Sequence, residues 1–490
     1  MSRSPWWLVL ALALWAAPAL AREPEAPPAE APASEVPPQE EPPRAPPADA
    51  PLRRDYLVPA LEGVAVNLGI FTFHNLLTLE PFALISWDTV KSHFDGRAGW
   101  TFDVDNFVVN QFAHPYHGSV AFAAARSSGV PFWQSGVYTV VSSLMWEYFA
   151  ENEAPAINDQ ITTTLGGMFL GEVLHRTYRV VIPEGGGRVS PLRRLTGVLI
   201  SPASALNDWI FGGEVSPGDI DAAPPLYFTL TPGLSLTTRL RERTENGPRL
   251  LVDQGAQVTL GGELTYGAVG DPLWRYHRPF SYFDASASVT FPGTIMGDIY
   301  IRGLVVGAQY GGATSRLRGL WGLFGLYDFG ANNIVQVSSV GVGLGTTLQW
   351  NLGRRVYLQG TAIVAGLGFA AAGSLGLESK LVRDYHIGPG VAGVLEARLV
   401  RPGLGMLRLR AREWQVNGGV YTAPRGFEAI TYVTWDARVS VGRHLAVGLE
   451  VPITLRVSDF GPEDTRVIGG GGARLTLSFM PDDNFGVTGR

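Results

Sequence analysis

The sequence predicts an α+β membrane protein, in which an antiparallel transmembrane β-barrel of about twelve strands follows an α-helical domain. Three observations lead to this prediction. The chain opens with an apolar segment typical of exported proteins. Residues 56–213 then carry apolar side chains at helical spacing, and residues 224–480 carry them at every second position, as strands do. A short tail, residues 481–490, follows the last expected strand, whereas a barrel's closing strand usually ends the chain.

Residues 1–21, MSRSPWWLVLALALWAAPALA, have the three parts of a secretory signal peptide. Arg3 provides the positive charge, an apolar run follows, and small residues precede a cleavage site expected after Ala21. The chain contains no cysteine. Disulfides, thiolate metal sites and a lipidated N-terminal cysteine are therefore excluded.

Residues 22–55 are rich in proline, alanine and glutamate and almost lack large apolar side chains. We expect an extended, disordered linker, because such a segment cannot bury a core. The net charge of -6 and the pI of about 5.8 show no basic excess, which argues against a nucleic-acid partner. After the signal peptide no uninterrupted apolar run reaches 18 residues, so we expect no ordinary membrane-spanning helix.

The helical domain, residues 56–213, contains segments with cap and stop signals at plausible ends. Ser86 is a candidate N-cap, and Gly129 follows an alanine-rich segment as a stop. Several segments are apolar on most faces, which indicates either burial in a bundle or contact with lipid. We expect helices at residues 59–80, 85–94, 114–129, 130–151, 154–178 and 190–213.

The barrel half alternates apolar and polar residues, most clearly in HLAVGLEVPITLRV at 444–457. A soluble β-sandwich alternates too, so alternation alone does not choose between the two classes. The export signal, the short turns and segments longer than the roughly 9–11 residues that a membrane strand needs favour a barrel. We expect strands at residues 226–240, 250–267, 280–292, 297–310, 316–329, 334–350, 355–369, 384–399, 405–417, 426–441, 444–457 and 466–480.

The polar face of these strands predicts a charged barrel lumen, in which acids and bases pair across strands. Such a wall is mostly structural, although it can also bind a ligand or pass an ion. In a channel, the row from Arg408 to Arg412 would favour anions. The expected lumen-lining residues are Glu263, Asp284, Glu396, Arg398, Arg408, Arg410, Arg412, Asp436, Arg438, Glu450 and Arg456.

The helical half contains ionisable residues inside apolar segments, where an unpaired charge is costly. The candidate site joins His114, Glu147 and Asp159, supported by Asn110, His117 and Asn158. A carboxylate can fix the tautomer of a histidine and prepare it as a general base. The same residues can equally form a buried hydrogen-bond network that anchors the helices. The sequence favours anchoring, with catalysis as the alternative.

A metal site is the weakest interpretation of this half. Glu172 and His175 have the Glu-x-x-His spacing of di-iron bundles, but such bundles need two of these motifs and two further glutamates. No nucleophile elbow, phosphate-binding loop or dinucleotide fingerprint is present. We therefore predict no metal and no cofactor.

Five motifs are distinctive: WTFDVDNFVVNQFAHPYHGS (100–119), SSLMWEYFAE (142–151), PAINDQITTTLGGMFLGE (155–172), GLYDFG (325–330) and YHIGPG (385–390). They resemble the signature blocks of an uncharacterised Gram-negative outer-membrane family, known only as a domain of unknown function. The resemblance would cover residues 55–415 and implies no activity. More distantly, the order of His114, Glu147 and Asp159 before a Gly-Gly helix is similar to VanZ-like small membrane proteins, which lends mild support to these residues acting as a unit.

The sequence favours a non-enzymatic outer-membrane protein, with the helical domain plugging or capping the periplasmic side of the barrel. Its role would be in envelope structure, assembly or transport. Outer-membrane lipid, lipopolysaccharide and the barrel-assembly machinery are the expected partners. The alternative is an enzyme that modifies membrane lipid or lipopolysaccharide, with His114 as base and Glu147 or Asp159 as its orienting group. A small-solute channel is the third hypothesis.

Overall fold

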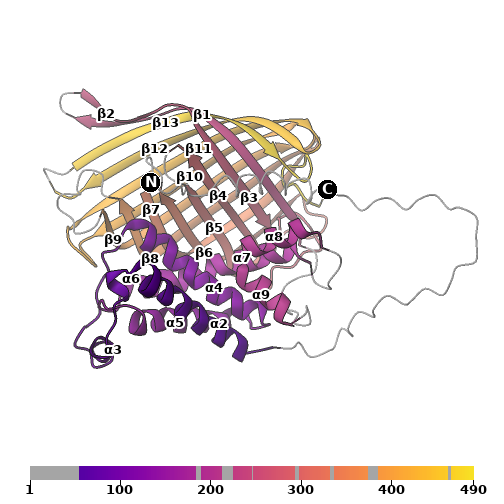
Figure 1. Ribbon diagram of the computed structural model, residues 1–490. Coiled ribbons are helices and arrows are strands. Elements are labelled where there is room, and N and C mark those ends of the chain that lie inside the picture. Colours follow the sequence, from indigo (N-terminus) through magenta and orange to yellow (C-terminus); the bar gives the residue numbers. More distant parts are fainter. Residues whose placement is uncertain are drawn as a thin grey trace, which may run out of the picture.

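The computed structural model describes residues 54–183, 189–211, 224–244, 247–292, 297–331, 336–373, 384–461 and 465–489. The expected signal peptide and nearly all of the expected linker lie outside these residues. Helices occupy the first half of the described chain, and strands occupy the second half (Figure 1).

The helices form close to where the periodicity predicts them. The expected helix at 190–213 is two helices, α8 and α9, because Pro202 disfavours helical geometry at Ser201. The bounds are α2 Leu57–Thr72, η1 Phe73–Thr78, η2 Pro81–Ala83, α3 Trp87–Phe94, η3 Val109–Ala113, α4 His114–Ser127, α5 Phe132–Phe149, α6 Ile157–Ile161, η4 Thr162–Gly166, α7 Gly167–Val181, α8 Pro191–Ile200 and α9 Pro202–Phe211.

One helix passes a length and composition criterion that the search for uninterrupted apolar runs did not meet. Helix α2 continues into η1, and Leu57–Thr78 is a 22-residue helix that is long and apolar enough to cross a membrane, with a mean hydropathy of 1.4. Glu62, Asn67 and His74 interrupt the apolar run, so a search for uninterrupted apolar residues misses the segment. Its average composition still meets the requirement of a membrane span.

The strands form one closed antiparallel sheet. Each strand pairs with its neighbours in sequence, and β13 pairs back onto β1. Strands β2 and β3 both pair with β1, so they are one wall strand interrupted at residues 255–256. The bounds are β1 Leu226–Thr244, β2 Gly247–Gln254, β3 Gln257–Tyr266, β4 Phe283–Phe291, β5 Asp298–Tyr310, β6 Leu317–Ala331, β7 Gln336–Gly353, β8 Val356–Gly373, β9 Tyr385–Arg401, β10 Gly405–Gly418, β11 Gly426–Gly442, β12 Leu445–Asp459 and β13 Thr465–Phe479.

The wall is thus a twelve-stranded barrel, and the predicted fold class is confirmed. Among the described residues, closure gives the wall strands two neighbours each, and only the β2 part of the interrupted strand, which pairs with β1 alone, keeps an open edge. Alternation then assigns a side to each residue. On β10, Leu407 and Leu409 are exposed on the outside, whereas Arg408, Arg410 and Arg412 are buried inside.

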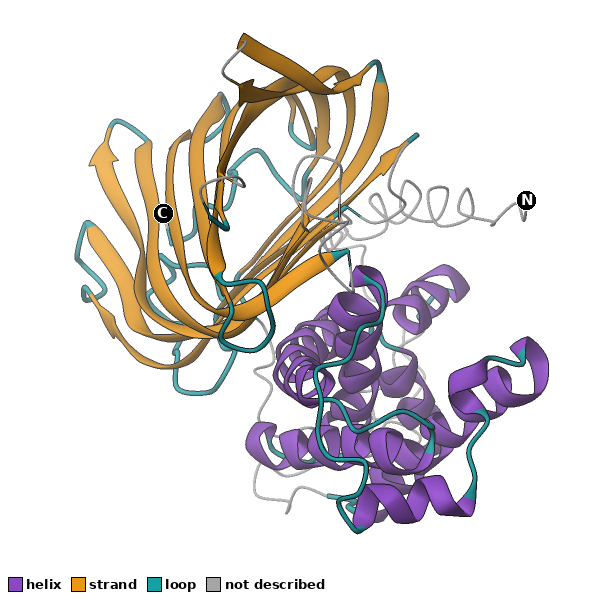
Figure 2. Ribbon diagram, turned by 90° about the vertical axis from the view of Figure 1, so that its left-hand side faces the viewer, coloured by secondary structure: helices purple, strands orange, loops and turns teal. Residues whose placement is uncertain are grey.

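The helical domain lies against the outer face of this wall (Figure 2). On β6, the contact residues Tyr327 and Phe329 share a face with Trp321, which is exposed on the outside. The ring of Phe107 stacks on Phe329 with centroids 5.8 Å apart, and the hydroxyl of Tyr327 donates to the carbonyl of Gln111 at 2.7 Å. Contact residues of the wall therefore point away from the lumen.

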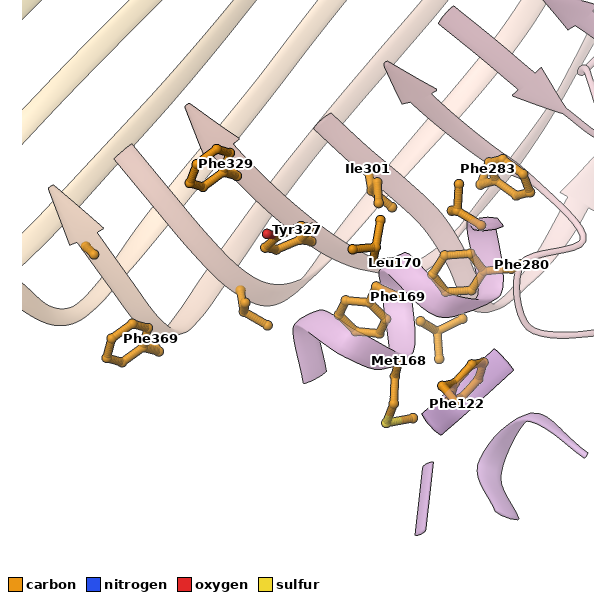
Figure 3. Close-up of a cluster of buried hydrophobic side chains, with 14 of the residues drawn as sticks. Phe122, Met168, Phe169, Leu170, Phe280, Phe283, Ile301, Tyr327, Phe329 and Phe369 are labelled. Atoms are coloured by element: carbon orange, nitrogen blue, oxygen red, sulfur yellow. The ribbon is translucent and has the colours of Figure 1, made fainter. Parts of the chain in front are cut away.

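The expectation that the helices plug or cap the barrel was therefore wrong. Aromatic side chains cover the outer ends of β4 to β9 and pack with α7 and the loop before β4 (Figure 3). A Cβ on Gly325 would lie 2.7 Å from the ring of Phe169, so this glycine allows α7 to approach the wall closely. Alternation predicts which residues face outward, but it does not predict whether lipid or a helix covers them.

The C-terminal segment closes one end of the barrel instead. Phe485 and Val487 are buried with Val400 and Met406 at the end where β13 finishes. Inward-facing side chains hold the segment by its carbonyls: Gln359 donates to Gly486 at 2.9 Å, Arg398 to Phe485 at 3.0 Å and Gln349 to Thr488 at 2.8 Å. The tail after the last strand is thus the structural seal of the lumen.

Candidate functional site

The lumen is divided into an apolar half and a polar half. Large apolar side chains from β5 to β11, among them Phe324, Leu326 and Trp414, fill one side. The inward residues of β1, β3 and β4 are mostly threonine, serine and glycine, so that side keeps a cavity of about 130 Å³. Gln254, Thr290 and Asp298 line it toward the end opposite the C-terminal seal.

A charged network forms the wall and floor of this chamber. Arg408 bonds Glu263 at 2.6 Å and Asp436 at 2.9 Å. Arg410 pairs with Glu396 and lies 3.4 Å from Asp284. These contacts join five strands across the lumen, and the row that would favour anions in a channel is instead paired with carboxylates.

The remaining predicted lumen residues take three different positions. Arg438 bonds Asp436 at 2.8 Å beside the chamber, and Glu450 lies in its wall and accepts from Arg474 at 2.9 Å. Arg398 belongs to the seal described above. Arg456 pairs with Glu428, which also lies 3.5 Å from His386.

Some guanidinium nitrogens at the chamber have no hydrogen-bond partner among the described residues. They are Nη1 of Arg438, Nε of Arg412 and Nε of Arg408. All three side chains are at least nine-tenths buried, and all three line the chamber. A buried donor without a partner costs about 1–3 kcal/mol, so these atoms favour an acceptor that enters the chamber.

In the helical domain, the structure brings His114 close to Asp159. Nε2 of His114 at the start of α4 lies 3.9 Å from Oδ2 of Asp159 in α6, which is an electrostatic contact rather than a hydrogen bond. The other oxygen of Asp159 accepts from Asn158 at 2.7 Å, and Asn158 in turn accepts from the amide of Asp103 at 2.7 Å. Both His114 and Asp159 are buried.

Glu147 holds the helix that carries Asp159. Its Oε2 accepts from the amide of Ala156, the N-cap residue of α6, at 2.6 Å. This contact anchors the start of a short helix whose other end continues into η4. Oε1 of Glu147 has no hydrogen-bond partner among the described residues.

The two supporting residues nearest His114 in sequence face elsewhere. Asn110 donates to the hydroxyl of Tyr385 at 2.7 Å and so joins η3 to the barrel. His117 lies 3.5 Å from the hydroxyl of Ser142, with its ring edge against Trp146. The candidate site is thus a pair, His114 and Asp159, with Glu147 and Asn158 positioning its acidic member.

Glu151, in the loop after α5, adds a further acid next to these residues. Burial, followed by the carboxylate of Glu147, raises the pKa of Glu151 well above its ordinary value, although a hydrogen bond from Trp146 opposes the shift. Asp103 and Asp105 add smaller contributions in the same direction. The helical domain therefore holds Glu151 in a setting that favours its neutral form.

Residues 99–203 match a family described as a domain of unknown function (DUF3943). The family resemblance is confirmed. The match covers the helical domain from the loop before η3 to the start of α9, a narrower range than the expected residues 55–415. The comparisons give no support to the VanZ-like resemblance, and no curated protein matches the chain.

Solved structures similar to the chain are outer-membrane barrels. They include the TodX monoaromatic hydrocarbon channel ΔS2 mutant (11% identity, 53% of this chain and 91% of that chain, TM-score 0.24). They also include the outer membrane protease OmpT from Escherichia coli (10% identity, 53% of this chain and 99% of that chain, TM-score 0.23). A third is OmpT of Vibrio cholerae (9% identity, 52% of this chain and 97% of that chain, TM-score 0.19). At these TM-scores none of them supports an inference about activity.

Sequence reasoning missed a buried ionic cluster at the centre of the helical domain. Arg126 donates to Glu172 at 2.6 Å and Arg176 donates to Glu172 at 2.7 Å, all three being at most 1% exposed. The spacing of Glu172 and Arg176 by four residues was a visible signal. His175 contacts Ser204 at 2.9 Å, so the Glu-x-x-His motif points its two side chains to different neighbours.

Proposed function

We propose that this protein is an outer-membrane barrel that binds a small solute with an oxyanion group in its lumen and does not conduct ions. The observation that carries this proposal is the chamber, which is sealed at one end and lined by arginine side chains that each carry a buried nitrogen without a hydrogen-bond partner among the described residues. Arginine is suited to such a ligand because it presents several donors to one carboxylate or phosphate.

The outer-membrane location is supported by the closed antiparallel wall and by its apolar outer residues. Outer-membrane lipid and lipopolysaccharide then surround the wall, and the barrel-assembly machinery inserts it. Apart from the connection at residues 267–282 between β3 and β4, the turns at the sealed end are short, as at residues 354–355 between β7 and β8. Short turns are typical of the periplasmic side, so the chamber faces the outside of the cell.

A binding role is favoured over a channel because several features block the lumen. The C-terminal segment fills one end, and apolar side chains fill one half of the cross-section. Across the chamber floor, each of Arg408 and Arg410 bonds more than one carboxylate. An ion crossing the lumen would have to break these pairs without new partners.

The test is isothermal titration calorimetry on the detergent-solubilised protein with inorganic phosphate and with citrate. At least one of them should bind, and Arg438→Gln should weaken binding about tenfold, since Arg408 still pairs with Asp436 in that variant. Arg401→Gln, at the exposed end of β9, should bind as the natural chain does. Absence of binding by both anions, or equal binding by Arg438→Gln, would overturn the proposal.

A lipid- or lipopolysaccharide-modifying enzyme is the second candidate function. The observation that favours it is the pair of His114 and Asp159 beside the unpartnered Oε1 of Glu147. The test compares the lipids of a deletion strain with those of strains restored by the natural chain, His114→Gln or His117→Gln. If this second candidate is right, only His114→Gln fails to restore the profile. Unchanged lipids in the deletion strain would exclude it.

A further inference from the structure

The face of the helical domain that points away from the barrel is apolar. On α2, Leu61 and Leu68 are 58% and 59% exposed, and Trp133 and Val137 on α5 are 60% and 58% exposed. Trp209 on α9 is 80% exposed. The residues on α2 and on α5 are spaced four or seven apart, so each helix presents a continuous stripe.

The interior of the same domain combines apolar side chains, such as Phe122 and Val173, with many polar ones, whereas its outer face is apolar. Glu172 with its two arginines is buried at the centre, and Asn67 on α2 turns inward to bond Ser142 on α5 at 3.1 Å. Polar groups that bond one another inside an apolar exterior are typical of helices surrounded by lipid.

The length of α2 and η1 agrees with the thickness of a bilayer. Leu57–Thr78 has 22 residues. Within its most apolar window of 18 residues, 11% of the residues are buried. At about 1.5 Å per residue such a helix reaches roughly 30 Å, the thickness of the hydrocarbon layer. Among the described residues, most of this helix has no protein neighbour that covers it.

The apolar face is continuous with the outer wall of the barrel. The helices pack on the outward sides of β4 to β9, and the same strands carry exposed Trp321, Val364 and Leu395 beyond the contact (Figure 2). Lipid that touches Val364 or Leu395 lies beside the helical domain. If lipid covered the barrel wall but water covered the helical face, a large apolar area of the helices would be exposed to water, which is unfavourable.

We propose that the helical domain lies in the same bilayer as the barrel, with α2 and η1 crossing its hydrocarbon layer and acyl chains covering the outer faces of α2 and α5. This rests on the outer-membrane location proposed above, and not on ligand binding in the lumen. The cluster of His114 and Asp159 then belongs to a membrane-embedded bundle, and any substrate reaches it from the lipid.

The absence of cysteine from the chain allows a direct test. Single variants Leu61→Cys and Val137→Cys carry a bimane fluorophore, and the protein is reconstituted in nanodiscs with brominated acyl chains or with iodide in the buffer. Both positions should be quenched by the brominated chains to within about twofold of Leu395→Cys on the barrel wall. They should be protected from iodide.

Arg243→Cys, in the hairpin that extends beyond the barrel, provides the water-exposed control and should show the opposite behaviour. Heat-dependent migration of the barrel in gels checks that each variant is folded. Quenching of Leu61→Cys and Val137→Cys by iodide alone would overturn the inference, since water would then cover this face. If the brominated chains also fail to quench the fluorophore on Leu395→Cys, the proposed membrane location of the barrel itself is wrong.

Discussion

The barrel and the helical domain both bury charges behind an apolar exterior, but they do so by different rules. In the barrel, period-two alternation sends Arg408, Arg410 and Arg412 into the lumen together, where carboxylates from other strands meet them. In the helices, Glu172 meets Arg176 on its own helix and Arg126 from another. Alternation along the strands leaves a cavity beside the charges of the barrel, whereas the side chains of the helical cluster are completely buried. This difference is the reason why we propose solute binding for the barrel and not for the helical cluster.

The largest expected effect is in the helical cluster. Glu172→Gln removes the charge that compensates Arg126 and Arg176, and breaking a buried ion pair in this way costs about 3–5 kcal/mol. The helical domain should become sensitive to protease while the barrel keeps its heat-dependent migration. Arg97→Gln, which breaks a pair with the exposed Asp95, should leave stability nearly unchanged, since solvent screens exposed ion pairs. Equal behaviour of the two variants would contradict the assigned role of the cluster.

The next effect tests the seal of the lumen. Phe485→Ala removes a fully buried ring, which should lower the free energy of unfolding by about 3 kcal/mol. The measurement is the midpoint of barrel unfolding in urea, together with single-channel recording. Stability should fall without the appearance of ion conductance, since the apolar half and the charged floor of the lumen remain. Open channels in this variant would show that the C-terminal segment alone blocks the lumen, which contradicts a non-conducting barrel.

The smallest effect concerns pH. Since the pKa of Glu151 is raised in the folded protein, its stabilising contribution is complete below about pH 4.5 and is lost as the pH rises through the raised value. The melting temperature of the helical domain should therefore fall from pH 5 to pH 8, and Glu151→Gln should reduce this fall. Helical circular dichroism follows the domain, and the strand signal of the barrel provides the internal control. An unchanged pH dependence in Glu151→Gln would exclude Glu151 as its source.

Local patterns in the sequence were sufficient for most of the fold. The twelve strands and the helical segments follow from spacings within about ten residues, because the strand and helix periods are properties of neighbouring residues. The pair of His114 and Asp159 could be proposed from residue type and burial cost alone. Even so, Asn110 bonds Tyr385 rather than His114, because the bonds of a helical polar residue depend on which element packs above it.

Residue patterns alone predicted most of the secondary structure, the even number of wall strands and the side of the wall on which each strand residue lies. That the helices lie against the outer wall and that the tail seals the lumen became visible only in the folded chain. Folding also brings Arg126 to Glu172 and leaves Arg438 with a nitrogen that has no partner among the described residues. The physical reason is the distance along the chain. Periodicity is a property of neighbouring residues, whereas these contacts join segments that are far apart in the sequence. Shape complementarity then selects the contact among many equally apolar surfaces.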